Sequence, residues 1–164
     1  MNIYLIGMMG SGKSVVGNML AKIIDMPFVD LDKEIEKKAG KSIAEIFLND
    51  GEIIFRTMES KQLRLIFDSI ISCGGGVILN KKNCTFIKQN GSTILLTASI
   101  EELSQRLQGS RTRPLLSGKN NLEILSDLWL ERKSQYLNTA DLVIDTDGKT
   151  VEKISQEIIK KLNI

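Results

Sequence analysis

Residues 7 to 14 constrain the fold of this 164-residue chain more than any other segment. They read Gly-Met-Met-Gly-Ser-Gly-Lys-Ser and fit the pattern GxxxxGK[ST]. The apolar stretch Ile3 to Ile6 precedes them, and apolar residues at helical spacing follow them from Val16 to Ile24. A strand, a glycine-rich turn and a helix in this order predict a phosphate-binding loop at a helix N-terminus. A Gly/Ser-rich turn could match the pattern by chance, but the flanking elements disfavour that alternative.

Each residue type in this loop suits a bound nucleotide. Glycines allow backbone N–H groups to converge on phosphate oxygens. Lys13 can reach the β- and γ-phosphates, and the Ser14 hydroxyl can bind Mg²⁺. We therefore expect the chain to bind ATP or GTP.

Composition limits the chemistry that is available. There is no histidine, the commonest general base and transition-metal ligand, so catalysis must rely on Asp, Lys, Arg and Mg²⁺. Those groups suit phosphoryl transfer, which depends on positioning and charge stabilisation. The two cysteines, Cys73 and Cys84, have no metal-ligand spacing, and we expect inert thiols.

Length and charge favour one cytoplasmic domain. The chain suits a single domain over residues 1–164, with monomer as the expected state. The formal net charge is +2 without a basic block, which gives no sign of a nucleic-acid or membrane partner. No apolar stretch reaches the ~18 residues that span a membrane, and the first strand begins by Ile3, which leaves no room for a targeting peptide.

Strand-like and helical segments alternate along the chain. This alternation predicts an α/β fold with a mostly parallel sheet and functional loops at the carboxyl ends of its strands. Three helical segments, about 33–38, 43–49 and 51–67, exceed what one crossover needs and indicate a substrate-binding insertion. The polar, basic stretch at about 108–121 is interpreted as a mobile lid between two helices, one starting near Glu101 and one at about 122–136. The expected strands are 3–6, 27–30, 70–73, 92–97 and 141–145.

Two carboxylates lie at the C-terminal end of the second expected strand. Asp30 and Asp32 lie two residues apart, so an extended strand would point both to one side, facing the nucleotide. One could orient the water shell of the metal while the other accepts a hydrogen bond from an acceptor hydroxyl. The alternative is that the two carboxylates form a helix N-cap pair, because Asp32 precedes a helical pattern.

Arg56 lies four residues after Glu52 and three before Glu59, so all three can share one helix face. A guanidinium held in this way presents a rigid fork to an anionic group such as a carboxylate. An ordinary surface ion-pair ladder is equally compatible with the spacing.

Glycines and arginines mark two further loops. Gly74 to Gly76 follow the third strand and could offer backbone N–H groups to a ligand, although a structural turn is the alternative. Arg106, Arg111 and Arg113 crowd the lid, where an arginine could neutralise the transferring phosphoryl group; a solvated basic loop is the alternative.

In its ordered motifs the chain resembles the shikimate kinases, small P-loop kinases of the nucleoside monophosphate kinase type. The likeness covers nearly the whole chain. The motifs are GxxxxGKS at 7–14, FxDxD at 28–32, GxxIxxIF at 40–47, GExxFRxxE at 51–59, the glycine triplet at 74–76, RPLL at 113–116 and RxxxY at 132–136. The resemblance implies a three-layer α/β/α P-loop kinase with a five-stranded parallel sheet, a substrate-binding helical insertion (about 31–61) and a lid (about 108–121).

The resemblance implies transfer of phosphate from ATP to the 3-hydroxyl of shikimate, giving shikimate 3-phosphate and ADP in chorismate biosynthesis. Catalysis would use Lys13, Asp32 and Arg113, with Asp32 as base or orienter of the attacking oxygen. Shikimate would contact Asp32, the Gly75 backbone, Arg56 supported by Glu59, and Arg132. Mg²⁺ would be bound by Ser14 and, through water, by Asp30. ATP would contact Gly10, Ser11, Gly12, Lys13, Ser14, Val15, Arg113 and Arg106, which would pack on adenine opposite the loop at 147–150.

The chain departs from the family pattern at two positions. Residues 132–136 read Arg-Lys-Ser-Gln-Tyr where RxPxY is common, and Val15 stands where threonine is frequent. Losing the proline relaxes the helix and could shift Arg132 slightly. The alternatives are another small-molecule P-loop kinase, acting on gluconate or a nucleoside monophosphate, and a nucleotide sensor without a second substrate. The absence of an NKxD motif and the presence of acceptor-site residues disfavour the sensor.

Overall fold

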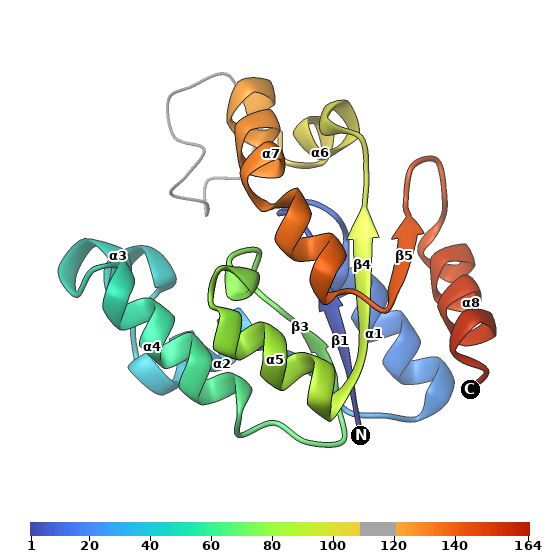
Figure 1. Cartoon of the computed structure of the whole chain (residues 1–164), viewed down its shortest axis with the longest axis horizontal. Coiled ribbons are helices and arrows are strands. Elements are labelled where there is room, and N and C mark those ends of the chain that lie inside the picture. Colours follow the sequence, from blue (N-terminus) through green and yellow to red (C-terminus); the bar gives the residue numbers. More distant parts are fainter. Residues whose placement is uncertain (109–120) are drawn as a thin grey trace.

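The computed structural model describes residues 1–108 and 121–164, and within these residues it contains one five-stranded sheet (Figure 1). The strand order is β2-β3-β1-β4-β5, and each neighbouring pair runs parallel. The predicted α/β class and parallel sheet are confirmed. The strands are β1 (Asn2–Ile6), β2 (Phe28–Asp30), β3 (Ile70–Ser72), β4 (Gly91–Thr97) and β5 (Leu142–Asp145).

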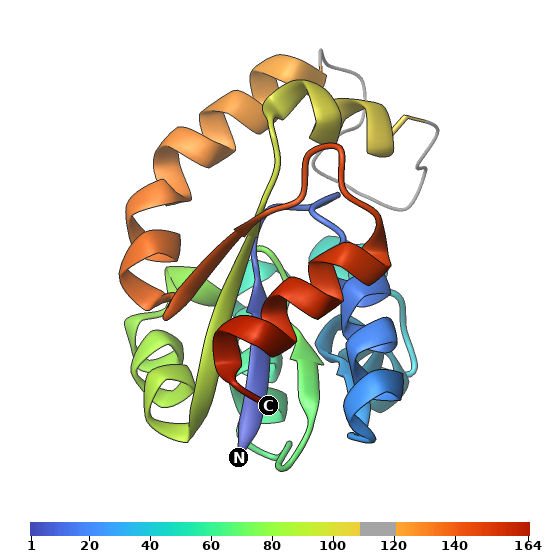
Figure 2. The same ribbon diagram turned by 90° about the vertical axis from the view of Figure 1, so that its right-hand side faces the viewer.

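Both faces of the sheet are covered by helices, because right-handed crossovers between parallel strands place them there. In β1, Tyr4 and Ile6 pack into one core, and Ile3 and Leu5 pack into the other. Helices α5 (Lys81–Asn90) and α7 (Asn121–Thr139) contribute to the first core, and α1 (Lys13–Ile24) and α8 (Val151–Leu162) to the second. Figure 2 shows these two pairs on opposite sides of the strands.

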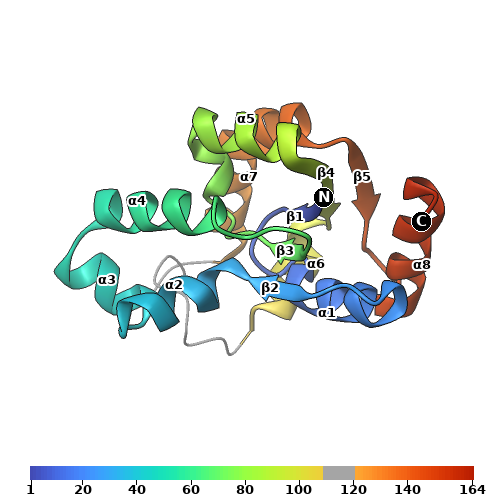
Figure 3. The same cartoon turned by 90° about the horizontal axis from the view of Figure 1, so that it is seen from below.

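Three helices separate β2 from β3 and extend to one side of the sheet (Figure 3). They are α2 (Leu31–Ala39), α3 (Ile43–Asn49) and α4 (Glu52–Leu63). Helix α3 has the predicted bounds, but α4 ends four residues before the predicted end at residue 67. The helical hydrogen bonds stop there because the Leu65 amide donates to the Gln62 carbonyl, three residues back, at 3.0 Å. The chain then turns into β3, where the Ser69 amide donates to Asn2 Oδ1.

The remaining short helices flank the loops that follow β3 and β4. Residues Val77–Leu79 form a 3₁₀ turn, η1, and Ile100–Arg106 form α6. Helix α6 starts near the predicted position, with Ser99 as N-cap accepting from the Glu102 amide. Across the described ranges, no helix has both the length and the apolar character needed to cross a membrane.

Candidate active site

The loop after β1 wraps around the ammonium group of Lys13. Lys13 Nζ donates to the carbonyl oxygens of Gly7 and Met8, both at 2.9 Å. Gly10 and Gly12 have φ of 80° and 90°, the left-handed region that favours glycine. At Gly7 a Cβ would collide with the Leu96 carbonyl of β4, so only glycine fits there. The amides of this turn lead directly into the N-terminus of α1, an arrangement suited to phosphate.

Three oxygen-bearing side chains meet beside this loop. Ser14 Oγ donates to Asp30 Oδ2 at 2.6 Å and lies 3.1 Å from Ser72 Oγ. They come from α1, β2 and β3, whose ends meet at the carboxyl edge of the sheet. Oxygen donors are the ligands that Mg²⁺ prefers, and Mg²⁺ usually combines one or two protein groups with substrate phosphates. In the described part of the chain, no group of three or more His, Cys, Asp or Glu could hold a metal unaided.

Asp30 and Asp32 do not share an extended strand, and that expectation is wrong. The strand ends at Asp30, whose Oδ1 accepts from the Lys33 amide at 3.4 Å and caps α2. Asp32 therefore lies in the first turn of α2, and the N-cap is Asp30 rather than Asp32. A Cβ on Gly74 would come within 2.8 Å of Asp32 Oδ1. Asp32 thus reaches the glycine triplet from the helix, while Asp30 remains beside Ser14.

Arg56 is held by two carboxylates on its own helix, as the spacing predicted. Its Nη1 donates to both Glu59 oxygens, at 3.1 and 3.0 Å, and its Nε and Nη2 donate to Glu52 Oε1. Glu59 is fully buried, so this is no surface ladder on that side. Burial raises the pKa of Glu59 to about 7, although the Arg56 cation acts in the opposite direction. The guanidinium lies against Gly76, where a Cβ would collide with it.

Arg132 approaches the same glycines from α7. It is only 7% exposed, and its Nη1 donates to the Gly75 carbonyl at a long 3.5 Å. Its Nε is buried and has no hydrogen-bond partner among the described residues. Such a donor is costly to leave unsatisfied, which marks this guanidinium as a candidate ligand group. Tyr136, which belongs to the RxxxY motif but was given no role from the sequence, is fully buried and donates to the Gly75 carbonyl at 2.5 Å.

Arg106 connects α6 to the phosphate-binding loop and to the loop after β5. Its Nη1 donates to the Gly10 carbonyl at 3.3 Å and to Thr146 Oγ1 at 3.0 Å, and its Nε donates to Glu102. Asp147 in turn accepts from the Ser99 amide. The guanidinium therefore lies at the edge of the loop that the sequence placed opposite it, at Thr146 rather than within 147–150.

One predicted residue, Val15, is not brought into this cluster. Val15 is 60% exposed on α1. Arg113, Arg111 and the lid from residue 109 to 120 lie outside the described residues. Ser72 was missed because the register that places β3 beside β1 is a long-range pairing that no local pattern encodes.

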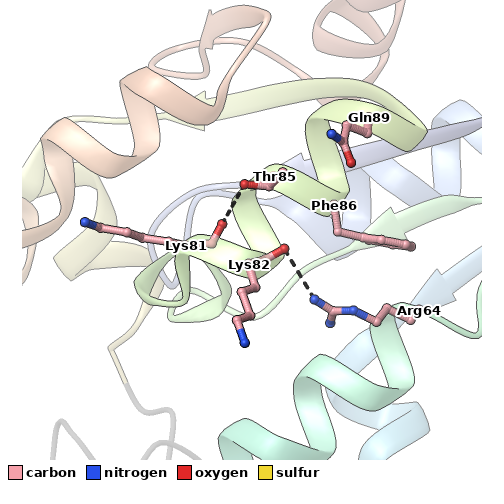
Figure 4. A pocket seen from close by; sticks show the side chains of 6 residues that line it. All are labelled: Arg64, Lys81, Lys82, Thr85, Phe86 and Gln89. Atoms are coloured by element: carbon pink, nitrogen blue, oxygen red, sulfur yellow. Dashed lines mark hydrogen bonds between the residues drawn. The ribbon is translucent and has the colours of Figure 1, made fainter.

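Two of the cavities on the described surface have different surroundings. One, of about 380 Å³, borders the phosphate-binding loop between α1 and α8 and is lined by Ser14, Val15, Asn18, Met19, Lys22, Val151 and Glu152. The other, of about 360 Å³, lies where the C-terminal end of α4 faces α5 (Figure 4). It is lined by Arg64, Lys81, Lys82, Thr85, Phe86 and Gln89. In it Arg64 stacks 5.1 Å from the Phe86 ring and donates to the Lys82 carbonyl.

Comparison with known proteins identifies close relatives. The sequence profile of a family described as shikimate kinase matches residues 9–163. The chain is 42% identical to shikimate kinase of Sulfurihydrogenibium sp. over 98% of its own length and 97% of that protein. It is 40% identical to shikimate kinase of Persephonella marina, over 98% of each chain. The structure of shikimate kinase from Acinetobacter baumannii in complex with shikimate superposes with a TM-score of 0.95 at 36% identity, covering 99% of this chain and 92% of that one.

Proposed function

The chain belongs to the shikimate kinase family, and from that premise we propose which of its residues bind and phosphorylate the substrate. The enzyme transfers the γ-phosphoryl group of ATP to the 3-hydroxyl of shikimate, giving ADP and shikimate 3-phosphate in the shikimate pathway. One observation carries the assignment of residues: Asp32, Arg56 and Arg132 converge on the glycine triplet beside the phosphate-binding loop.

The shikimate carboxylate is bound by Arg56 and Arg132. Arg56 is oriented by Glu59 and Glu52, so little side-chain freedom is lost when an anion binds. Arg132 brings a buried Nε that has no partner in the described structure, and a carboxylate would satisfy it. The backbone of Gly75 completes the pocket.

Asp32 orients the attacking hydroxyl and accepts its proton. The oxygen of the 3-hydroxyl forms a bond to the γ-phosphorus while the bond from that phosphorus to the bridging oxygen of ADP breaks. The hydroxyl proton passes to the Asp32 carboxylate. The position of Asp32 against Gly74 supports this role, because it places an oxygen acceptor next to the proposed acceptor pocket.

Lys13 and Arg113 stabilise the charge of the transferring group. Lys13 donates to the Gly7 and Met8 carbonyls, and we infer that it exchanges these partners for phosphate oxygens when ATP binds. Arg113 would approach from the lid. Ser14 would hold Mg²⁺ directly and Asp30 through water, and the donor set of Ser14, Asp30 and Ser72 fits that ion. Bound Mg²⁺ would neutralise charge on the phosphates.

The rest of the ATP site is built from the loop and α6. The backbone of Gly10, Ser11 and Gly12 would contact the phosphates, and Arg106 would pack on adenine with the loop at 147–150. Val15, exposed beside the 380 Å³ cavity, would contact the nucleotide at its rim. We further propose one domain over 1–164, with a substrate-binding insertion at about 31–61 and a lid at about 108–121, acting as a cytoplasmic monomer.

Purified protein with Mg²⁺-ATP and a panel of acceptors tests the function. We expect ADP release with shikimate and none above background with gluconate, AMP or no acceptor. Release with AMP instead would discard the carboxylate clamp, meaning the binding of a substrate carboxylate by Arg56 and Arg132, and would retain only a P-loop kinase. Release with gluconate, which is itself a carboxylate, would contradict shikimate as the acceptor. Tight ATP binding with no acceptor-dependent release would identify a nucleotide sensor.

A further inference from the structure

The glycine triplet needs something to hold its shape, because glycine has the most backbone freedom of any residue. The hydrogen bonds at its two ends are clear: the Cys73 amide donates to the Leu5 carbonyl at 3.0 Å, and the Val77 amide donates to the Gly74 carbonyl at 3.1 Å. The middle carbonyl, that of Gly75, accepts from side chains of α7 instead. The acceptor pocket therefore depends on α7 for the conformation of its central peptide.

The two donors to the Gly75 carbonyl differ in strength. Tyr136 donates at 2.5 Å, whereas Arg132 Nη1 donates at 3.5 Å, the outer limit of a hydrogen bond. Tyr136 is fully buried and its ring is stacked on Trp129, with ring centroids 6.1 Å apart. Burial raises the pKa of the phenol, which keeps it a neutral donor. Tyr136 is therefore the stronger and more rigid of the two hydrogen-bond donors to the Gly75 carbonyl.

The peptide that Tyr136 holds also positions Arg56. The Gly75 carbonyl and the Gly76 N–H belong to one planar unit, so fixing one end fixes the other. Gly76 lies directly against the Arg56 guanidinium, with no room for a Cβ between them. A change in the conformation of this peptide would therefore move the surface against which Arg56, the proposed ligand of the substrate carboxylate, is packed.

We propose that Tyr136 is a positioning residue for the acceptor substrate, an inference that rests on the proposed function. Its hydroxyl fixes the Gly75–Gly76 peptide, so that Arg132 can turn from the Gly75 carbonyl to the substrate carboxylate without loosening the pocket. Tyr136 touches neither substrate; it acts through the backbone of the glycine triplet. Its effect falls on shikimate and not on ATP.

The test compares Tyr136→Phe with Tyr4→Phe. The chain has two tyrosines, both fully buried, and the Tyr4 hydroxyl pairs with Asn2 at the opposite edge of the sheet. Both variants keep the ring and lose one buried hydrogen bond. We expect Tyr136→Phe to raise the KM for shikimate about five- to tenfold, with the KM for ATP within twofold of the parent. Tyr4→Phe lowers stability without changing either KM.

A binding measurement separates affinity from turnover. Trp129 is the single tryptophan and contacts Tyr136, so its fluorescence can report shikimate titrations in the parent and in both variants. We expect the Kd for shikimate to rise as the KM does. An unchanged Kd in Tyr136→Phe, equal losses for shikimate and ATP, or the same loss in Tyr4→Phe would overturn the proposal. Inactivity of the parent protein with shikimate would instead contradict the proposed function.

Should Tyr136→Phe fail to fold, the parent protein still tests the idea. The buried Tyr136 hydroxyl proton should exchange slowly and be visible by NMR, coupled to the Gly75 carbonyl. We expect this coupling to persist when shikimate binds. Its loss on shikimate binding would mean that Tyr136 releases the loop and does not position it.

Discussion

At the residue scale, each glycine of the triplet lies against a side chain with a proposed role in the acceptor site. Gly74 lies beside Asp32, the Gly75 carbonyl accepts from Arg132 and Tyr136, and Gly76 lies against Arg56. The side chains that pack against this loop would collide with a Cβ at Gly74 or Gly76. These contacts, more than the turn geometry of the loop itself, are therefore the reason for glycine at these positions.

Gly76→Ala should separate folding from substrate binding. The added Cβ would overlap the Arg56 guanidinium, but that group ends a flexible side chain and can swing away. We expect a small loss of stability and a rise of roughly tenfold or more in the KM for shikimate, because a displaced guanidinium no longer meets the carboxylate. The KM for ATP, measured in the same assays, serves as the internal control. Equal increases in both constants would contradict this explanation.

Asp32→Asn should retain ATP binding and lose turnover. The amide keeps the size of the side chain but cannot accept a proton, so we expect kcat to fall by about 10²- to 10⁴-fold. Glu34→Gln, at the other acidic position in the first turn of α2, is the matched control. Steady-state kinetics measure the kcat of each variant, and a titration measures its ATP binding. Near-normal turnover by Asp32→Asn would refute the role of Asp32 as base or orienter.

Glu59 should make stability depend on pH. Its pKa is raised to about 7 by burial, so folding takes up a proton between the ordinary value of 4.5 and about 7. The resulting stabilisation is fully present below 4.5 and is lost as the pH rises through about 7, on the order of 3 kcal/mol in all at 1.4 kcal/mol per pKa unit.

Urea unfolding of the parent protein and of Glu59→Gln between pH 4.5 and 8 measures this effect. The stability difference, parent minus variant, should fall as the pH rises, while contributions from other carboxylates cancel. Glu52→Gln is the matched control, because it removes an exposed carboxylate from the same guanidinium. A difference that stays flat or grows with pH would contradict the assignment.

At the element scale, the site is assembled from the ends of helices and strands. Arg106, the last residue of α6, bonds to the carbonyl of Gly10 and to Thr146, so one side chain connects the loops after β1 and β5. Both loops border the space that we assign to the nucleotide. Arg106 therefore has a structural role, the connection of these two loops, in addition to its proposed contact with adenine. The sequence did not predict that role.

Arg106→Ala should weaken ATP binding selectively. Losing the link between the two loops and the proposed packing on adenine should raise the KM for ATP roughly tenfold, with a smaller change for shikimate. Gln105→Ala, an exposed neighbour on the same helix, is the control. An unchanged KM for ATP would show that the Arg106 guanidinium contributes only to the structure of α6 and not to ATP binding.

The sequence predicted elements well where a local pattern defines them. The strands, the bounds of α3 and the ion pairs of Arg56 with Glu52 and Glu59 follow from periodicity and spacing. The start of α2 at Leu31 did not, because the carboxylate of Asp30, the last residue of β2, also caps the helix. As a result, Asp32 lies in the first turn of a helix and not on the face of a strand.

At the scale of the whole molecule, the parallel topology brings the site together. Because β1 lies between β3 and β4, the phosphate-binding loop adjoins the glycine triplet, and Ser72 comes within 3.1 Å of Ser14. These contacts join residues far apart in sequence, so no local pattern predicts Ser72 as part of the site, and the RxxxY motif alone did not indicate what Tyr136 contacts. The lid and Arg113 remain predictions.

The carboxylate clamp is the central claim about this site, and one substrate comparison tests it most directly. The kcat/KM for shikimate should exceed that for its neutral methyl ester by about 100-fold in the parent protein, because the ester cannot make charge-assisted hydrogen bonds to Arg56 and Arg132. In Arg132→Ala the ratio should shrink to about tenfold or less, as expected when one of two interacting groups is already removed. Equal kcat/KM values for acid and ester in the parent protein would contradict the clamp.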